Sequence, residues 1–372
     1  MRIALVHSYY SSRVPSGENR VVDAQAQALR EGGHDVTVVA QSTDARMERR
    51  TYPLAAAATA ATGRGPSPLE ELHRFGPDVV HVHNLFPNFG TAWLGRWDGP
   101  LVATLHNFRA LCPAGTLFRD GHVCRDCPTA GSARPGVRHG CFHDSTLATV
   151  PVALGTRFAR DPVLRRSDVI TTLSEGMSEV YAEHGVPPDR LVVVDNFADG
   201  DPSPGPGGDA WLFAGRIEPE KGLHELLHHW PRGHRLLVAG DPAQGVPLPA
   251  HPDVTVLGQL SPERLRSLMG EARGLVFPSL WLEGLSLVCL EALSVGTPIL
   301  TFDDIPAGRS VAELGVGLAV PREDIATGLR RAMATFPDVR DHCFGVFAER
   351  FTASAWLRRI EGVYRRALAV HS

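Results

Sequence analysis

Short apolar runs alternate with longer amphipathic stretches along the whole chain, which is typical of parallel βα units. In the first half the strand-like runs are RIALVHS, HDVTVVAQ, DVVHVHN, LVATLHN, SDVITTLS and RLVVVDNF. In the second half they are AWLFAG, RLLVAGDP, VTVLGQL, GLVFPS, TPILTF and GVGLAV. Between the first two runs, ENRVVDAQAQALREGG predicts an amphipathic helix that ends at glycines. We therefore predict an α/β fold made of two Rossmann-like, doubly wound parallel-sheet domains.

A stretch rich in proline and glycine, DGDPSPGPGGDA, lies near the middle of the chain and offers little to a core. It predicts a linker over residues 199–210, between an N-terminal domain 1–198 and a C-terminal domain 211–350. The remaining residues, 351–372, include SAWLRRIEGVYRRALAV, which predicts a helix with one apolar side. We expect this helix to pack back on the first domain. A chain of 372 residues has the length for two domains of ordinary size.

Charge and composition exclude several classes of function. A formal net charge of −4 and a pI near 6.5 argue against a nucleic-acid-binding surface. The chain starts on the strand-like run MRIALV and has no run of about eighteen apolar residues, so we expect a cytoplasmic protein without membrane contact. A nicotinamide dehydrogenase would need G-x-G-x-x-G after the first strand, and HSYYSSRVPSGEN does not contain it.

Two cations follow the first strand of the second half. Arg216 comes directly after WLFAG, and Lys221, the only lysine of the chain, is expected at the start of the next helix. A helix N-terminus disfavours a cation by about 0.3–1 kcal/mol, so this placement suggests a compensating anion. Phosphate suits an ammonium group together with a guanidinium group. A surface loop with two exposed cations is the alternative interpretation.

Two glutamates lie in the otherwise apolar segment SLWLEGLSLVCLEALSVGTPIL, residues 279–300. The pattern predicts a helix from about residue 285 to Ser294, with Gly296 as its C-terminal cap. Glu283 then lies in the loop before the helix and Glu291 about a turn and a half inside it. Their carboxylates could accept hydrogen bonds from a sugar and from a ribose diol, although Glu291 could instead be paired locally.

The N-terminus of this helix is also a candidate anion site, because backbone N–H groups there have no partner within the helix. Together the cations, the carboxylates and these N–H groups predict a nucleotide-sugar site. Its loop and helix-start residues are Gly284, Leu285, Ser286 and Leu287.

The arginine and lysine five residues apart, followed by Glu-x7-Glu in EGLSLVCLE, resemble the retaining family 4 glycosyltransferases of GT-B fold. The resemblance extends over nearly the whole chain. It implies that Arg216 and Lys221 hold the donor diphosphate, that Glu291 binds the ribose and that Glu283 contacts the transferred sugar.

The same resemblance implies transfer of a hexosyl group, with retention, from a nucleoside diphosphate sugar to a hydroxyl of a small-molecule or glycan acceptor. UDP is the first expectation for the nucleotide and GDP the second. No cofactor is expected for catalysis. A nucleotide-sugar epimerase of the same fold is the alternative function.

Residues of the first domain that follow strands are candidates for the acceptor side. Gly17 precedes a helix, where backbone could approach a sugar or phosphate of the donor closely. His106 ends the strand LVATLH, and the resemblance gives it a catalytic position beside the reacting sugar, together with Arg216, Lys221 and Glu283. Asn84 and Asn107 are acceptor-binding candidates, and His81 and His83 are assigned to structure. No acidic nucleophile is identified near His106.

Four of the six cysteines, Cys112, Cys124, Cys127 and Cys141, lie in the stretch 108–143 that follows His106. The Cys-x2-Cys pair with two further cysteines favours a structural zinc site; free thiols and disulfides are the alternatives. His122, His139 and His143 are possible replacement ligands. This insertion is expected to shape the acceptor pocket, whereas Cys289 and Cys343 are expected to be core thiols.

Overall fold

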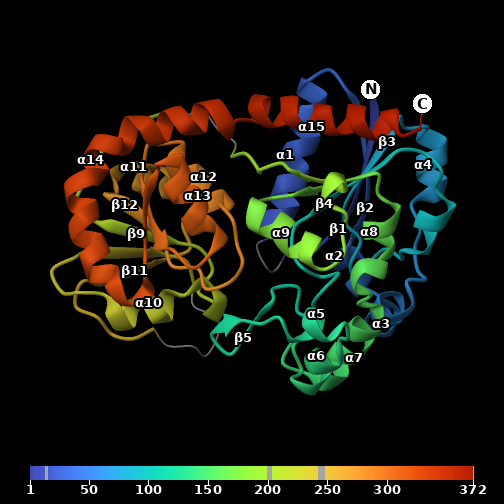
Figure 1. The fold of residues 1–372 in the computed structure, drawn as a ribbon, viewed down its shortest axis with the longest axis horizontal. Helices are drawn as coiled ribbons and strands as arrows, with labels where there is room; N and C mark the ends of the chain where they lie inside the picture. The colour runs from blue at the N-terminus through green and yellow to red at the C-terminus, as the bar shows by residue number, and fades with distance from the viewer. Residues whose placement is uncertain (13–15, 199–202, 242–247, 372) are drawn as a thin grey trace. The chain divides into compact units, whose positions relative to one another are not determined.

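The structure, a computed structural model, describes residues 1–12, 16–198, 203–241 and 248–371 (Figure 1). Residues 199–202 of the predicted linker 199–210 therefore lie outside the described residues. The chain divides into two compact units. The first comprises residues 1–119, 124–194 and those from 356 onward, and the second comprises residues 120–123 and 195–355.

The first unit contains a six-stranded sheet in the order β2-β1-β3-β4-β7-β8, whose neighbouring strands pair in parallel. The strands are β1 (Arg2–Tyr9), β2 (Asp35–Ser42), β3 (Val79–Asn84), β4 (Leu101–Leu105), β7 (Val169–Thr172) and β8 (Leu191–Val193). A further pair of two-residue strands consists of β5 (Phe118–Arg119) and β6 (His122–Val123).

Helices connect the strands of the first sheet. They are α1 (Gly17–Glu31), α2 (Thr43–Met47), α3 (Tyr52–Thr62), α4 (Leu69–Phe75), α5 (Asp126–Ala130), α6 (Arg134–Arg138), α7 (Thr146–Gly155), α8 (Pro162–Arg166) and α9 (Glu175–Glu183). Short 3₁₀ turns are η1 (Ala92–Arg96), η2 (Phe158–Arg160) and η3 (Pro188–Arg190).

The second unit repeats this architecture with a parallel sheet in the order β11-β10-β9-β12-β13-β14. Its strands are β9 (Trp211–Ala214), β10 (Leu236–Ala239), β11 (Val254–Gly258), β12 (Gly274–Phe277), β13 (Ile299–Phe302) and β14 (Gly317–Val320). The helices and 3₁₀ turns are η4 (Pro219–Lys221), α10 (Leu223–His229), α11 (Pro262–Glu271), α12 (Leu287–Leu293), α13 (Pro306–Leu314), η5 (Arg322–Asp324) and α14 (Ile325–Arg350).

Every strand-like run of the sequence is a strand in one of the two large sheets, so the predicted fold class is confirmed. In both sheets the order reverses direction beside the first strand, which makes each a doubly wound sheet. The last helix, α15 (Ala353–Ala369), matches the predicted C-terminal helix. From Trp356 onward it belongs to the first unit.

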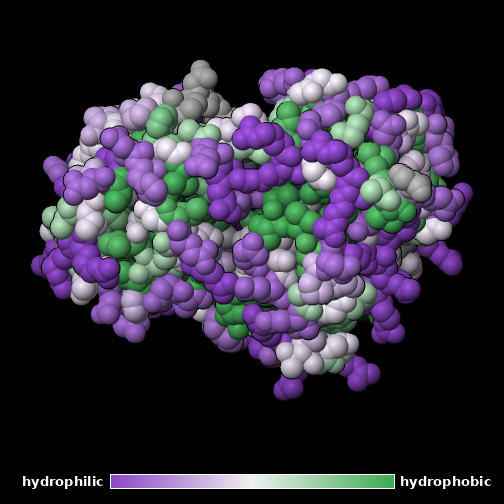
Figure 2. All heavy atoms as spheres, turned by 45° about the horizontal axis from the view of Figure 1, so that its top comes forward, coloured by the Kyte–Doolittle hydropathy of each residue, from purple (hydrophilic) through white to green (hydrophobic). Residues whose placement is uncertain are grey.

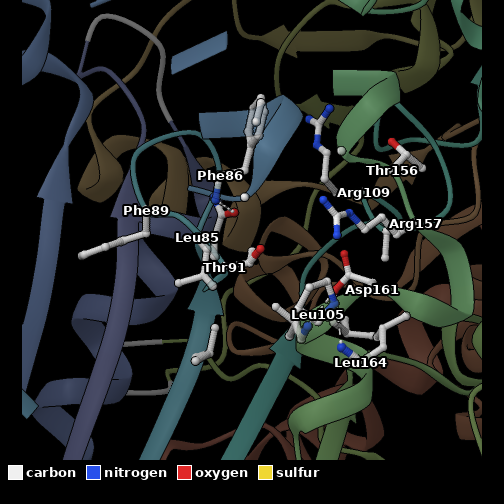
Figure 3. A pocket seen from close by; sticks show the side chains of 18 of the residues that line it. Leu85, Phe86, Phe89, Thr91, Leu105, Arg109, Thr156, Arg157, Asp161 and Leu164 are labelled. Atoms are coloured by element: carbon white, nitrogen blue, oxygen red, sulfur yellow. Dashed lines mark hydrogen bonds between the residues drawn. The ribbon is translucent and has the colours of Figure 1, made fainter. Parts of the chain in front are cut away.

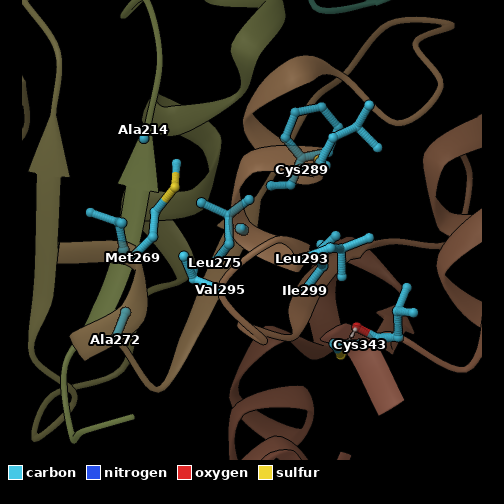
Figure 4. Packing of buried hydrophobic residues seen from close by; sticks show 14 of the residues in the cluster. Ala214, Met269, Ala272, Leu275, Cys289, Leu293, Val295, Ile299 and Cys343 are labelled. Atoms are coloured by element: carbon cyan, nitrogen blue, oxygen red, sulfur yellow. Dashed lines mark hydrogen bonds between the residues drawn. The ribbon is translucent and has the colours of Figure 1, made fainter. Parts of the chain in front are cut away.

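The core of the second unit forms where α12 and α14 cover the sheet (Figure 4). Leu275 of β12 and Ile299 of β13 are completely buried, as are Cys289 and Leu293 of α12 and Cys343 of α14. Cys289 and Cys343 are thus the core thiols that the sequence predicts. Because four residues of the short helix α12 are buried (Cys289, Leu290, Ala292 and Leu293), packing determines where the helix lies.

A chain of buried polar side chains joins α15 to the first sheet. The Tyr364 hydroxyl lies 2.8 Å from His81 Nδ1, and His81 Nε2 lies 2.7 Å from the Thr104 hydroxyl. Thr104 in turn lies 2.6 Å from the Thr171 hydroxyl on β7. Both ring nitrogens of His81 therefore have partners, which a buried imidazole requires. His81 is a structural residue, as the sequence analysis assigned it.

Burial lowers the pKa of His81 from 6.5 to about 3. The unfolded chain binds a proton at this histidine near pH 6.5, whereas the folded chain binds it only near pH 3. We therefore expect the free energy of unfolding to fall as the pH decreases below 6.5, by about 1.4 kcal/mol per pH unit from this residue. In the variant His81→Asn the slope between pH 6.5 and 5 should decrease by about that amount.

Urea titrations of the wild type and the variant at several pH values measure these slopes. The matched control is His73→Asn, because His73 is exposed on α4 of the same unit. The control should keep the wild-type slope. Equal slopes in His81→Asn and the wild type would contradict the prediction.

Candidate active site

Lys221 is brought close to the loop after β12 by an unusually tight turn. Gly222 has a φ of +71°, and a Cβ atom there would lie 1.8 Å from the Pro278 carbonyl oxygen. The Leu280 amide also donates to the Glu220 carbonyl at 2.9 Å. Lys221 is the last residue of η4, and helix α10 begins two residues later. Lys221 therefore lies two residues before the start of the helix where the sequence predicts it, because the chain first makes a 3₁₀ turn.

Lys221 and Glu283 form an ion pair in the second unit. The lysine Nζ lies 2.8 Å from both oxygens of the Glu283 carboxylate. The Ser279 hydroxyl donates to Glu283 Oε2 at 2.9 Å, and the Trp281 indole N–H donates to it at 2.6 Å. The two side chains are 17% and 11% exposed, respectively. Charge-assisted hydrogen bonds in a site this sheltered hold both groups in one geometry.

Arg216 follows β9 after Gly215 and is accessible to solvent. Its Nη1 donates to Glu218 at 2.7 Å, and its side chain is 48% exposed. Burial raises the pKa of the Glu218 carboxyl, and this effect is opposed by the Arg216 guanidinium. Because the Arg216 guanidinium is exposed and contacts Glu218 through one nitrogen, its other N–H groups remain available to donate to a phosphate.

Helix α12 begins one to two residues after the predicted start near Leu285–Ser286 and ends one residue before the predicted end at Ser294. Ser286 is its N-cap, and the helix runs from Leu287 to Leu293. Ser294, and not Gly296, is the C-cap; Gly296 lies two residues further with a φ of +73° and donates its N–H to the Leu293 carbonyl. Glu291 lies inside the helix and is half-buried, as expected for a side chain at the margin of the core.

Among the four predicted donor-side residues, the structure brings Lys221 and Glu283 into direct contact. Arg216 contacts Glu218, and Glu291 lies on α12. All four belong to the second unit. Their convergence on one ligand stays a prediction.

In the first unit, parallel pairing brings histidines at the carboxyl ends of β1, β3 and β4 together. His83 Nδ1 lies 3.0 Å from His106 Nε2, and the two rings are 5.3 Å apart. His7 Nε2 lies 3.1 Å from Asn19 Oδ1 on α1. These contacts make His106 part of a stack of imidazoles.

The imidazoles of this stack are neutral at pH 7. Burial is the main cause that lowers the pKa of His7 to about 4 and that of His106 to about 3. Burial also lowers the pKa of His83 far below its usual range, and the nearby His81 and His106 add to the effect. His106 can therefore offer a hydrogen bond to a substrate, but not a positive charge.

Glu18 is a candidate residue that the sequence analysis missed. It lies in the first turn of α1, next to Gly17, and its Oε1 is buried without a hydrogen-bond partner among the described residues. Burial raises the pKa of this carboxyl to about 7, opposed by the Arg109 guanidinium and the amides of Asn84 and Asn107. No acidic nucleophile near His106 is identified from the sequence. The structure places one acidic group, the Glu18 carboxyl, next to Asn107, the residue that follows His106.

The signal that could have revealed Glu18 was its position directly after Gly17, at the start of the helix that follows the first strand. That helix start faces the carboxyl ends of the neighbouring strands in a parallel sheet. A single sequence shows no reason to prefer this glutamate over the many exposed ones, because its neighbours come from distant loops.

The four cysteines of residues 108–143 surround one small cavity, and all are free thiols. Burial raises the pKa of Cys127 to about 11, and the other three thiols add to this rise. Within the described part of the chain, no group of three or more His, Cys, Asp and Glu side chains that could hold a metal ion is found. The cavity is lined by Cys112, Cys124, Cys127 and Cys141 together with Pro113 and Gly136.

On the face that Figure 2 shows, hydrophilic side chains surround smaller apolar areas. No helix within residues 1–12, 16–198, 203–241 and 248–371 has the length and apolar character needed to cross a membrane.

Comparisons with known proteins agree with this arrangement of two sheets. The sequence profile of glycosyltransferase family 4 matches residues 15–201, and that of the glycosyl transferases group 1 matches residues 208–336. The chain is 26% identical over 393 aligned positions to a glycogen synthase of Mycobacterium tuberculosis, covering 91% of this chain and 86% of that protein. It is 27% identical over 366 positions to a phosphatidyl-myo-inositol mannosyltransferase of Mycolicibacterium smegmatis, covering 90% and 84%.

Among solved structures, HepE of Anabaena in complex with UDP-glucose superposes with a TM-score of 0.60 at 14% identity. The superposition covers 98% of this chain and 99% of HepE. The protein is thus an enzyme, a glycosyltransferase with the GT-B fold. It belongs to glycosyltransferase family 4. The epimerase alternative receives no support from these relatives.

Proposed function

We propose that this glycosyltransferase transfers a hexosyl group, with retention at the anomeric carbon, from a nucleoside diphosphate sugar to an acceptor hydroxyl. UDP is the nucleotide we favour. HepE, a structural neighbour, is solved with UDP-glucose. The hydroxyl-bearing acceptor is a small molecule or a glycan. The observation that carries the proposal is the sheltered contact between Lys221 and Glu283, with Arg216 exposed on the same unit.

In this proposal, the donor diphosphate competes with Glu283 for the Lys221 ammonium group. Without donor, Lys221 neutralises the carboxylate. When the diphosphate accepts from Lys221 and Arg216, an oxygen of Glu283 becomes available for a hydroxyl of the transferred sugar. Because the Ser279 and Trp281 donors remain, the carboxylate stays oriented while its partner changes.

The remaining donor contacts follow from the start of α12. Glu291 is proposed to accept from the ribose hydroxyls, and backbone N–H groups at the helix start to face the diphosphate. Gly17 in the first unit is proposed to allow close approach of the donor. The backbone groups of the proposed donor seat belong to Gly284, Leu285, Ser286 and Leu287.

The bond changes need no protein nucleophile. The bond between the anomeric carbon and the diphosphate oxygen breaks, and the acceptor oxygen bonds to that carbon on the same face. The leaving phosphate takes the acceptor proton. Lys221 and Arg216 stabilise the charge that develops on the diphosphate, and the neutral His106 is proposed to hydrogen-bond the reacting sugar.

Lys221→Ala should lower the transfer rate by a factor on the order of 10²–10³, as expected when one preorganised charge donor is lost. Binding of UDP should weaken in the same variant, because the diphosphate loses an ion-pair partner. Steady-state transfer rates with a panel of nucleotide sugars and calorimetry with UDP measure the two effects.

The matched control is Arg232→Ala, which removes an exposed cation of the same unit outside the proposed site. Circular dichroism of both variants tests whether the fold is retained. Near-normal transfer by a folded Lys221→Ala protein would contradict the proposed donor site.

We further propose that Glu18 orients the acceptor hydroxyl. Its Oε1 has no partner among the described residues, and Asn84 and Asn107 stand next to it. As a carboxylate it would accept a hydrogen bond from the hydroxyl; as a carboxylic acid it would accept less well. With a pKa of about 7, the group changes state within the neutral range.

The rate at low acceptor concentration should therefore rise as the pH increases through about 7 in the wild type. In Glu18→Gln this rise should disappear, and the KM for the acceptor should increase at pH 8. The KM for the donor should stay near the wild-type value. An unchanged pH profile in Glu18→Gln would show that another group causes the rise.

We also propose that Cys112, Cys124, Cys127 and Cys141 hold a structural zinc ion. Support comes from the shared cavity and from the effect of each thiol on the pKa of Cys127. The described side chains would have to turn toward the cavity, since they form no metal-binding group as they stand. Zinc would favour the thiolates that burial otherwise disfavours.

Metal analysis of protein purified without added metal should give about one zinc per chain, the stoichiometry of a single Cys₄ site. Cys127→Ser should lose most of the metal, and Cys343→Ala should keep it because Cys343 is a core thiol of the second unit. Protein free of zinc, or equal zinc in both variants, would contradict the zinc proposal.

A further inference from the structure

A cavity of about 140 Å³ lies in the first unit beside the carboxyl ends of β3 and β4 (Figure 3). All residues that line it belong to this unit. It reaches from the histidines and asparagines at the strand ends to the helices α3, α7 and α8. A cavity with a polar edge and an apolar body is the usual form of a small-molecule site.

The body of the cavity is apolar because several buried side chains face it. Leu85 and Phe89 come from the loop after β3, Val152 from α7 and Leu164 from α8; their exposed fractions are 6%, 3%, 5% and 2%. An apolar cavity of about 150 Å³ is large enough for one benzene ring and holds no ordered water. The space here therefore fits a ring of six carbons or a short alkyl segment.

The polar edge of the cavity is formed by residues of the candidate active site. His83, Asn84, His106 and Asn107 line it. Asn84 Nδ2 is buried without a hydrogen-bond partner among the described residues. A ligand group at this edge would therefore meet this amide, which the Glu18 carboxyl also approaches.

Arg109 lies at the same edge, close to two aromatic rings. Its guanidinium carbon is 4.6 Å from the centre of the Phe86 ring and 5.4 Å from that of Phe142. Arg109 Nε is also buried without a partner among the described residues. Arg109 and Phe86, which both line the cavity, thus limit how far a ligand can extend from the polar edge.

At the opposite side of the cavity, the Asp161 carboxylate already has hydrogen-bond partners. Its carboxylate accepts hydrogen bonds from the Val163 and Leu164 amides at 2.8 and 3.4 Å and so caps α8. The Arg157 guanidinium opposes the rise that burial causes in the pKa of Asp161. The unused hydrogen-bonding groups of the cavity are therefore concentrated at the strand ends.

We propose that this cavity binds an apolar group of the acceptor, a ring or short alkyl segment, while the acceptor hydroxyl lies at Asn84 and Asn107. The inference rests on the proposed transferase function and assigns the acceptor class. A sugar alone would leave its hydroxyls without partners among Leu85, Phe89 and Leu164, which is unfavourable. The apolar group is that of a compact aglycone or of a lipid chain.

Binding experiments without donor test the cavity directly. Methyl, phenyl, hexyl and dodecyl β-glucosides are titrated into the full-length protein by calorimetry. The phenyl and hexyl compounds should bind at least about ten-fold more tightly than the methyl compound, because only they carry the group that fills the cavity. Affinity that stops rising at hexyl indicates a compact aglycone, and affinity that keeps rising to dodecyl indicates a lipid chain.

Val152→Trp fills the cavity and should remove the preference for the phenyl compound. The control, Leu147→Trp, adds the same ring to the same helix at a position that is 86% exposed, and should keep the preference. If Val152→Trp does not fold, Val152→Thr places a hydroxyl in the wall at similar volume and should weaken phenyl binding several-fold. UDP should bind equally to every folded variant.

Equal affinities for methyl and phenyl glucosides, or phenyl binding unchanged in the Val152 variants, would overturn the proposal. Phenyl binding without transfer to that compound from any nucleotide sugar of the panel would overturn the acceptor assignment. If the wild type does not bind UDP, the proposed donor is wrong instead. Failure of the acceptor proposal and failure of the donor proposal are therefore distinguishable.

Discussion

Parallel pairing of β1 with β3 and of β3 with β4 is the constraint on which the chemistry of the first unit depends. The register sets His7 opposite Asn84 and His81 opposite Val102, so the carboxyl ends of three strands share one edge. Side chains at that edge are buried by the loops that follow, and burial keeps the imidazoles neutral. The same loops leave an apolar cavity next to unpaired polar atoms. The proposed acceptor site depends on this one constraint.

The second unit uses the same sheet architecture but brings an ion pair to the loops that follow its strands. Lys221 and Glu283 form an ion pair there, although 62 residues separate them in sequence. Gly222 makes the contact possible, because any side chain at that position would collide with the Pro278 carbonyl. In the first unit, buried neutral imidazoles and apolar side chains lie beside the Arg109 guanidinium and the Asp161 carboxyl. In the second unit, the contact between the strand-end loops is an ion pair.

Much of the fold and part of the candidate site could be predicted from local patterns. Periodicity and glycine positions predict the strands and the helices α1, α12 and α15. Apolar or helical surroundings predict the core thiols Cys289 and Cys343. Local patterns were less accurate for the helix ends, where Lys221 belongs to a 3₁₀ turn and Ser294 replaces Gly296 as the cap. Glu18 was missed because the groups that act on its carboxyl, Arg109, Asn84 and Asn107, are not near it in sequence.

By itself, the sequence determined the class of fold, the residue types available at each strand end and the motifs that resemble family 4. Those properties depend on neighbours within a few residues, whose spacing can be read directly. Only the tertiary structure decided that Lys221 contacts Glu283, that Tyr364 contacts His81 from 283 residues away, and that an apolar cavity adjoins Asn84. Such contacts depend on which strands pair and how closely loops pack, and both result from the summed burial of the whole unit rather than from any local pattern.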